Sequence, residues 1–133
     1  RGNEHAEPPA FGEVPEWVPG LGILRGEVRR LEGRGVKVPH VGWNAADFTA
    51  SGERCPLFDG VADGTYFYHT HSYVCHPEDS SQVIATTEHG ARFASAVWDG
   101  RLVFGTQFHP EKSSAAGQRV MSNFTSLALR SAL

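Results

Sequence analysis

Two glycine-containing turns divide residues 82–108 into three β-favouring runs, and this pattern constrains the fold more than any other feature of the chain. Asp99-Gly100 is a dipeptide that tight turns between paired strands prefer, and His89-Gly90 is a weaker form of it. The runs around these turns are rich in β-branched and aromatic residues. We therefore predict a three-stranded antiparallel meander over residues 82–108.

The sequence before the meander predicts three further strands. Two of them are short apolar runs, within Gly22–Leu31 and within Arg34–Asn44. Pro39 indicates that the second run lies at a sheet edge or ends early, because proline cannot donate a backbone hydrogen bond. The third strand is the aromatic-rich run Thr65–His71, and one helical turn is expected near Pro56–Phe58.

A helix is predicted after the meander, from about residue 114 to residue 130. Its apolar residues recur at the spacing of one helix face, which we expect to pack on the sheet. These residues are Val120, Met121, Phe124, Leu127 and Ala128. Ser113 or Ser114 is the expected N-cap. Strands followed by a covering helix indicate an α/β protein.

Composition restricts the function classes. The length of 133 residues suffices for one domain, and a net charge of −3 argues against a nucleic-acid surface. No apolar run approaches the roughly 18 to 20 residues that a membrane span needs, and Arg1–Ala10 does not resemble a signal peptide. The two cysteines fit a cytosolic enzyme better than a disulfide-rich secreted domain.

A histidine and a carboxylate follow the third strand of the meander. His109 lies just past the expected strand end, Pro110 stops the strand, and Glu111 comes before the predicted helix. Turns at strand ends are common places for active sites in α/β proteins. A carboxylate can orient an imidazole and stabilise its protonated form, so the pair suggests a general base. An ordinary surface histidine beside an exposed glutamate is the alternative.

Other histidines and the cysteines carry weaker hypotheses. His69, His71 and His76 lie close together in sequence, and His69 and His71 share a strand face, so a metal-dependent hydrolase is one alternative. Packing or polar lining is the commoner role of strand histidines. Cys55 and Cys75 lack the tight glycine-flanked turn that exposes a nucleophilic thiolate.

Several motifs together resemble a known family. Residues 107–113 (QFHPEKS) resemble the histidine–glutamate end of the class I glutamine amidotransferase triad. Residues 37–44 (KVPHVGWN) and 66–73 (YFYHTHSY) resemble segments of the glutaminase subunits of imidazole glycerol phosphate synthase, as does the continuation through Ser114. The motifs span roughly residues 20–127. Related amidotransferases, such as the anthranilate synthase type, usually lack the Pro-His-x-Gly-Trp-Asn stretch.

The resemblance implies a chemistry for named residues. In the family a cysteine thiolate attacks the glutamine side-chain amide, ammonia leaves, and water releases glutamate. By position, His109 is the general base and acid, and Glu111 orients it. Ser72 and Tyr73 match the segment that binds glutamine, largely through backbone groups, and Glu4 matches another glutamine contact. The implied fold is the C-terminal portion of a flavodoxin-like class I amidotransferase sheet.

The resemblance also implies a partner. The ammonia of this family enters a cyclase subunit with a (β/α)₈ barrel, in a heterodimer that acts in histidine biosynthesis in the cytoplasm. Trp43, Asn44 and Lys112 match positions at that subunit interface, although Trp43 also suits a core aromatic. No cofactor and no metal are implied. Residues 1–19 are expected to be an irregular segment, and 20–133 a partial amidotransferase domain.

One family feature is missing from these residues. The Gly-x-Cys-x-Gly elbow that carries the nucleophile does not occur. The chain is therefore expected to resemble the C-terminal two thirds of a glutaminase subunit, and to be inactive alone because His109 has no thiol to activate. A non-catalytic interaction protein that keeps the interface is the second hypothesis, which retention of His109 and Glu111 disfavours.

Overall fold

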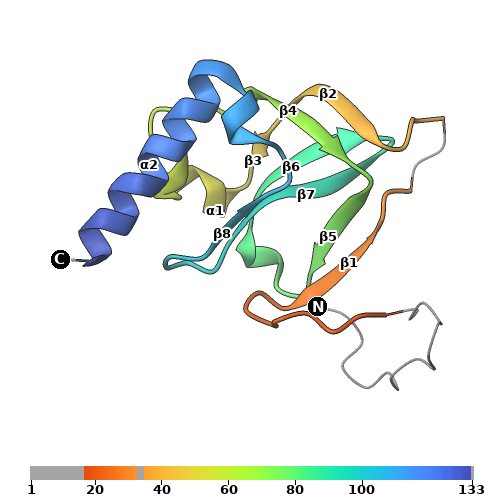
Figure 1. Cartoon of the computed structure of the whole chain (residues 1–133), viewed down its shortest axis with the longest axis horizontal. Helices are drawn as coiled ribbons and strands as arrows, with labels where there is room; N and C mark the ends of the chain where they lie inside the picture. The colour runs from red at the N-terminus through yellow and green to blue at the C-terminus, as the bar shows by residue number, and fades with distance from the viewer. Residues whose placement is uncertain (1–16, 33–34, 133) are drawn as a thin grey trace.

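The computed structural model describes residues 17–32 and 35–132 (Figure 1). In chain order the elements are β1 (Gly26–Arg30), β2 (His40–Ala45), β3 (Asp47–Phe48), α1 (Ala50–Glu53), the 3₁₀ turn η1 (Pro56–Phe58), β4 (Tyr66–His71), β5 (Tyr73–Pro77), η2 (Ser80–Gln82), β6 (Val83–His89), β7 (Ala91–Trp98), β8 (Phe104–Thr106), η3 (Pro110–Lys112) and α2 (Ser114–Ala132).

The strands form two sheets, and all of the strand pairs in them are antiparallel. The larger sheet has the order β1-β5-β7-β6-β3, with β8 also paired to β7. The smaller sheet consists of β2 and β4. Two side-chain hydrogen bonds join the sheets: Asn44 Nδ2 donates to the Glu88 carbonyl, and Thr87 Oγ1 donates to the Ala45 carbonyl. The small sheet is thereby held against β6.

The predicted meander is confirmed as β6-β7-β8. Gly90 and Gly100 both have positive φ, as tight turns require. The third strand is shorter than the sequence pattern suggested, because the Asp99 carboxylate accepts hydrogen bonds from the backbone N–H groups of Arg101 and Val103. These bonds hold the residues after Gly100 in the turn, so strand pairing with β7 starts only at Phe104.

Two of the three upstream strands are placed as expected, and the other is shifted. β1 and β4 lie inside their predicted ranges, and the helical turn at Pro56–Phe58 is present. In the run that contains Pro39, Val36 and Val38 are not in a strand, and β2 begins at His40 rather than ending early at Pro39. The missing N–H of Pro39 limits the start of this strand, not its end. The sequence pattern did not predict β3, α1 or β5, which are elements of two, four and five residues.

The main core lies between the small sheet, the meander and the start of α2. At its centre the rings of Phe67 and Phe108 stack with centroids 4.1 Å apart, and both residues are buried. A second, smaller cluster of Leu31, Val74 and Phe93 lies under β1 and β5. The stack joins β4 to the segment just before His109, so core packing fixes the place of the candidate site.

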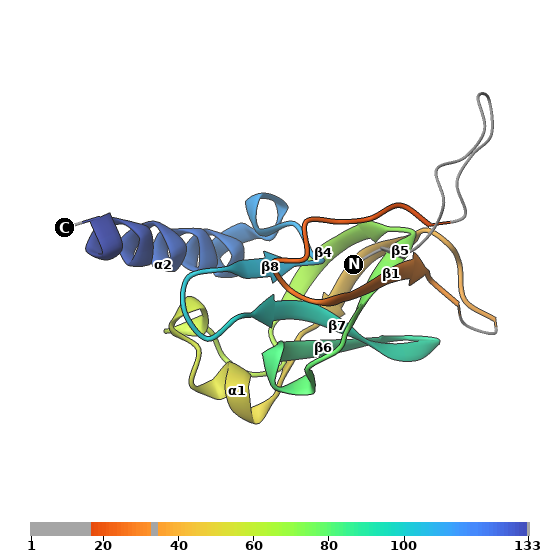
Figure 2. The same ribbon diagram turned by 90° about the horizontal axis from the view of Figure 1, so that it is seen from below.

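The C-terminal helix is confirmed, but its packing differs from the expectation. Of the apolar face, only Val120 is buried, and Phe124 is about half exposed. Phe124 contacts Phe104 of β8 edge-on, but the helix packs mainly on η1 and η3, and Asn123 Nδ2 donates to the carbonyls of Leu57 and Asp59. Its C-terminal part extends past the strands (Figure 2). No helix in the described part of the chain is long and apolar enough to cross a membrane.

Candidate active site

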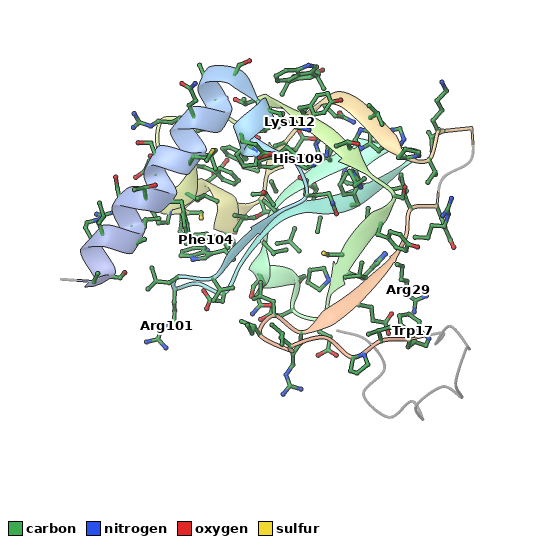
Figure 3. All side chains as sticks on the ribbon, viewed as in Figure 1. Trp17, Arg29, Arg101, Phe104, His109 and Lys112 are labelled. Carbon is green, nitrogen blue, oxygen red and sulfur yellow. The ribbon has the colours of Figure 1, made fainter. Side chains whose placement is uncertain are left out.

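His109 lies on the turn that leads from β8 through η3 into α2 (Figure 3). Its backbone N–H donates to the Tyr68 carbonyl of β4 at 2.9 Å. Pro110 then starts η3 and removes a donor that a longer strand would need. The chain therefore turns away from the sheet immediately after His109. This turn brings the Glu111 side chain beside the His109 ring.

The structure brings His109 and Glu111 together. His109 Nδ1 lies 2.7 Å from Glu111 Oε1, and the two side chains are 36% and 51% exposed. The pKa of Glu111 is lowered, first by its own backbone N–H and then by the His109 ring. An ionised carboxylate only accepts hydrogen bonds, so His109 carries its proton on Nδ1. The lone pair of Nε2 is then free to accept a proton from a nucleophile.

Ser113 holds this turn against β4. Its hydroxyl accepts from the Tyr68 N–H at 2.9 Å and donates to the His109 carbonyl at 2.7 Å, and the residue is 1% exposed. Sequence analysis assigned Ser113 or Ser114 as a helix cap, and so missed this bridge. No local sequence pattern could have found it, because Tyr68 is 45 residues away.

Two of the predicted glutamine-binding residues, Ser72 and Tyr73, lie just beyond β4. Ser72 follows the end of β4 and Tyr73 begins β5, so at about 3.3 Å per residue Ser72 is roughly 13 Å along the chain from Tyr68. The Ser72 carbonyl accepts from the Leu31 N–H, and the Tyr73 carbonyl accepts from His71 Nδ1. The Tyr73 side chain is about half exposed. Glu4, the third predicted glutamine contact, lies outside the described residues.

The three predicted interface residues differ in their surroundings. Trp43 is half exposed and packs edge-on against Tyr68, its partner in the β2–β4 register, with centroids 6.0 Å apart. Lys112 is exposed on η3, beside the candidate catalytic pair (Figure 3). Asn44 is held by the chain itself, because its amide reaches Glu88 and its Oδ1 accepts from the Ala45 N–H.

Neither cysteine has the surroundings of a nucleophile. Cys55 is buried, and burial raises the pKa of its thiol to about 11. Cys75 lies on β5, and burial of its thiol also raises its pKa. A raised pKa keeps a thiol protonated, whereas nucleophilic cysteines need a lowered one.

A histidine cluster lies on β2 and β4, and it includes His69, the residue after Tyr68, whose carbonyl accepts from the His109 N–H. His40 pairs with His71 in the β2–β4 register, and His69 lies on the same strand face as His71. Desolvation and the neighbouring histidines lower the pKa of His40 to about 4 and that of His69 to about 3, and desolvation also lowers the pKa of His71. The sequence grouping with His76 was wrong, since His76 is exposed on β5 and His40 takes its place.

Comparisons with known proteins agree with these motifs. Residues 21–127 match the family model of class I glutamine amidotransferases. The chain is 49% identical over 110 residues to "Imidazole glycerol phosphate synthase subunit HisH" of Moorella thermoacetica, covering 83% of this chain and 50% of that protein. It is 42% identical over 113 residues to the protein of the same name from Thermococcus kodakarensis, covering 82% and 55%. The chain thus spans about half the length of the curated relatives it matches.

Proposed function

The chain belongs to the class I glutamine amidotransferase family, and from that premise we propose that it supplies the histidine–glutamate part of a glutamine-hydrolysing site. The His109–Glu111 contact of 2.7 Å carries the proposal, because it leaves Nε2 as the free base. The names of the relatives support the assignment to imidazole glycerol phosphate synthase, whose glutaminase subunit yields glutamate and ammonia.

In the first half of the proposed reaction, in which ammonia leaves and a thioester forms, this chain moves one proton, and in the second half it moves a proton from water back to the sulfur as glutamate is released. His109 Nε2 takes the proton of a cysteine thiol as the sulfur attacks the glutamine amide, and then passes it to the leaving ammonia. Glu111 stabilises the imidazolium that forms between these steps. Backbone groups of Ser72 and Tyr73 bind the glutamine, with Glu4 as a further contact. The thiol itself comes from outside these residues, since neither Cys55 nor Cys75 has suitable surroundings.

The proposal includes a partner. Trp43 and Lys112 both expose their side chains next to Tyr68 and the η3 turn, which suits an interface with a cyclase subunit that receives the ammonia. Asn44 would support that interface indirectly, because its hydrogen bonds hold β2 in place. A cytoplasmic location and a domain that begins near residue 20 belong to the same proposal. They rest on the similarity to biosynthetic subunits and on the family match that starts at residue 21.

A chimera tests the proposed function. In the Moorella thermoacetica relative, the aligned region is replaced by this chain, and glutamate release is measured with and without the cyclase subunit of that organism. We expect cyclase-stimulated hydrolysis, and a loss of roughly 10²- to 10⁴-fold in His109→Asn, the range of general acid–base catalysis. His76→Asn is the matched control, because His76 is an exposed histidine outside the site.

The other outcomes separate the alternatives. A chimera that binds the cyclase without releasing glutamate would support the non-catalytic interaction protein. Stimulation by the partner of an anthranilate-type enzyme, but not by the cyclase, would indicate that the chain is part of a related amidotransferase. Full activity in His109→Asn would overturn the catalytic assignment.

A further inference from the structure

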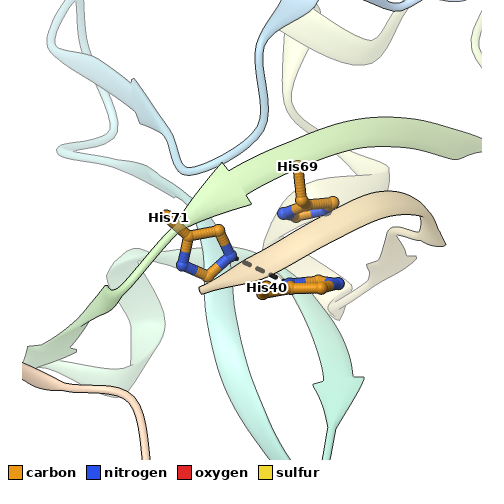
Figure 4. Close-up of side chains that lie close together, drawn as sticks. All are labelled: His40, His69 and His71. Atoms are coloured by element: carbon orange, nitrogen blue, oxygen red, sulfur yellow. Dashed lines mark hydrogen bonds between the residues drawn. The ribbon is translucent and has the colours of Figure 1, made fainter. Parts of the chain in front are cut away.

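Three histidine side chains from two paired strands meet at one point. His40 lies on β2, and His69 and His71 lie on β4 (Figure 4). One ring nitrogen of each lies within 4.8 Å of the others, and His40 Nδ1 is 3.0 Å from His71 Nε2. The strand register fixes this arrangement, because His40 is opposite His71 and side chains two residues apart share a face.

His69 is the unusual member of the cluster. It is fully buried, and neither of its ring nitrogens has a hydrogen-bond partner among the residues that the structure describes. Its ring contacts are aromatic, with His40 stacked at 4.6 Å between centroids and Phe93 and Phe108 edge-on at about 6 Å. Buried polar atoms are nearly always satisfied, so the lone pair of this ring indicates a ligand that the described protein atoms do not supply, and a single ion would use one of the two nitrogens.

The hydrogen bonds of His71 leave one lone pair directed into the cluster. Its Nδ1 lies 3.0 Å from the Tyr73 carbonyl, which can only accept, so the proton is on Nδ1 and the lone pair of Nε2 faces His40 Nδ1. Metal-binding histidines typically donate their other N–H to a backbone carbonyl in this way, which fixes the ring. His71 therefore has the tautomer and the support that a metal ligand needs.

We propose that His40, His69 and His71 bind one divalent transition-metal ion of the zinc and copper class. Neutral imidazoles are the preferred nitrogen ligands of these ions. Two ligands at about 2.0–2.1 Å in tetrahedral geometry are about 3.3 Å apart, close to the present spacing of His40 and His71. With three protein ligands, the fourth position stays open to water or another small ligand.

Binding changes one tautomer and releases no proton. In the metal-free chain His40 Nδ1 donates to His71 Nε2, and Asn44 Nδ2 donates to His40 Nε2 at 3.3 Å. When the metal takes both lone pairs, the His40 proton moves from Nδ1 to Nε2 through solvent. The long Asn44 contact is then lost, while Asn44 keeps its 2.8 Å bond to the Glu88 carbonyl.

Zinc titration of the chelator-treated chain tests the proposal. Calorimetry with Zn²⁺ alone should give one ion per chain. His69→Phe, which keeps an aromatic ring in the buried position, and His71→Gln should each weaken binding at least about tenfold. His76→Gln is the matched control, and we expect its affinity to equal that of the unaltered chain. The imidazole resonances of the unaltered chain give a readout that needs no variant: Zn²⁺ should shift those of His40, His69 and His71 but not that of His76.

Three results would overturn the proposal. The first is an unaltered chain that binds no Zn²⁺. The second is binding that survives both His69→Phe and His71→Gln with unchanged affinity, which would indicate surface histidines. The third is a Zn²⁺-induced shift of the His76 resonances without a change in the cluster. Since His71 is partly exposed, its glutamine variant remains informative if His69→Phe does not fold.

Discussion

At the scale of single residues, Glu111 determines which nitrogen of His109 can act as a base. Its carboxylate accepts the Nδ1 proton at 2.7 Å, and its lowered pKa keeps it ionised well below neutral pH. In the chimera, Glu111→Gln should lower kcat for glutamine hydrolysis about 100-fold with little change in KM, because the imidazolium loses its stabilising charge. Exposed Glu53→Gln is the control. A change in KM alone would instead indicate a binding role.

Ser113 is expected to matter for stability although it touches no substrate. Ser113→Ala leaves the Tyr68 N–H without its acceptor and removes a donor to the His109 carbonyl, all in a buried setting. We expect a loss of about 1–3 kcal/mol in the free energy of unfolding, measured by urea denaturation. Ser122→Ala, on the exposed side of α2, should change it by less than about 0.5 kcal/mol. Equal effects would argue against the bridge.

Cys55 should be chemically silent at neutral pH. With a pKa of about 11, only about one thiol in 1000 is ionised at pH 8. In a Cys75→Ser chain, alkylation of Cys55 should therefore be slow and rise about tenfold per pH unit toward pH 11. The same chain in denaturant is the control and should react rapidly at pH 8. Rapid, pH-independent labelling of the folded chain at pH 7–8 would contradict a buried, protonated thiol.

The sequence could predict site residues only where they are neighbours in the chain. His109 and Glu111 are two residues apart on one turn, so their spacing already suggested a pair. The roles of Ser113 and His40 depend on partners 45 and 31 residues away. Those contacts arise from the pairing of β2 with β4 and from the packing of η3 on β4, which no local pattern encodes.

At the scale of elements, the same distinction explains which parts of the fold were predictable. The meander followed from two local turns with glycine at positive φ. The partners of β5 did not, because β5 pairs with β1, some 45 residues earlier, and with β7. Helical periodicity predicted the extent of α2 and the burial of Val120 in the main core, but it could not predict the hydrogen bonds from Asn123 that also fix the helix to η1.

Gly117 shows how closely α2 packs on η3. A Cβ at this position would collide with the Pro110 carbonyl. Glycine to alanine in a helix interior ordinarily stabilises by about 1 kcal/mol, but here the sign should reverse. We expect Gly117→Ala to lower the free energy of unfolding by about 1–3 kcal/mol in urea denaturation. Exposed Ser126→Ala in the same helix should be nearly neutral. A stabilised Gly117→Ala chain would show that the helix and η3 separate easily.

At the scale of the whole molecule, the histidine cluster lies where the two sheets meet. His40 and His69 belong to the small sheet, and both contact Phe93 of β7 in the large sheet. His40 also stacks on His89 of β6, with centroids 3.9 Å apart. An ion bound there would therefore stabilise the contact between the two sheets as well as the pairing of β2 with β4.

Zn²⁺ is accordingly expected to stabilise the entire fold. A ligand that binds only the folded state at 100 times its Kd adds about 2.7 kcal/mol, which for a chain of this size raises Tm by roughly 10 °C. Thermal unfolding followed by circular dichroism should show this rise, and a chelator should reverse it. Mg²⁺, which prefers oxygen ligands, should leave Tm unchanged. The His69→Phe chain should not respond to Zn²⁺, because it lacks one of the three ligands. An equal rise in that variant would place the stabilising ion elsewhere on the molecule, and the junction between the sheets would then be held by its hydrogen bonds and ring contacts alone.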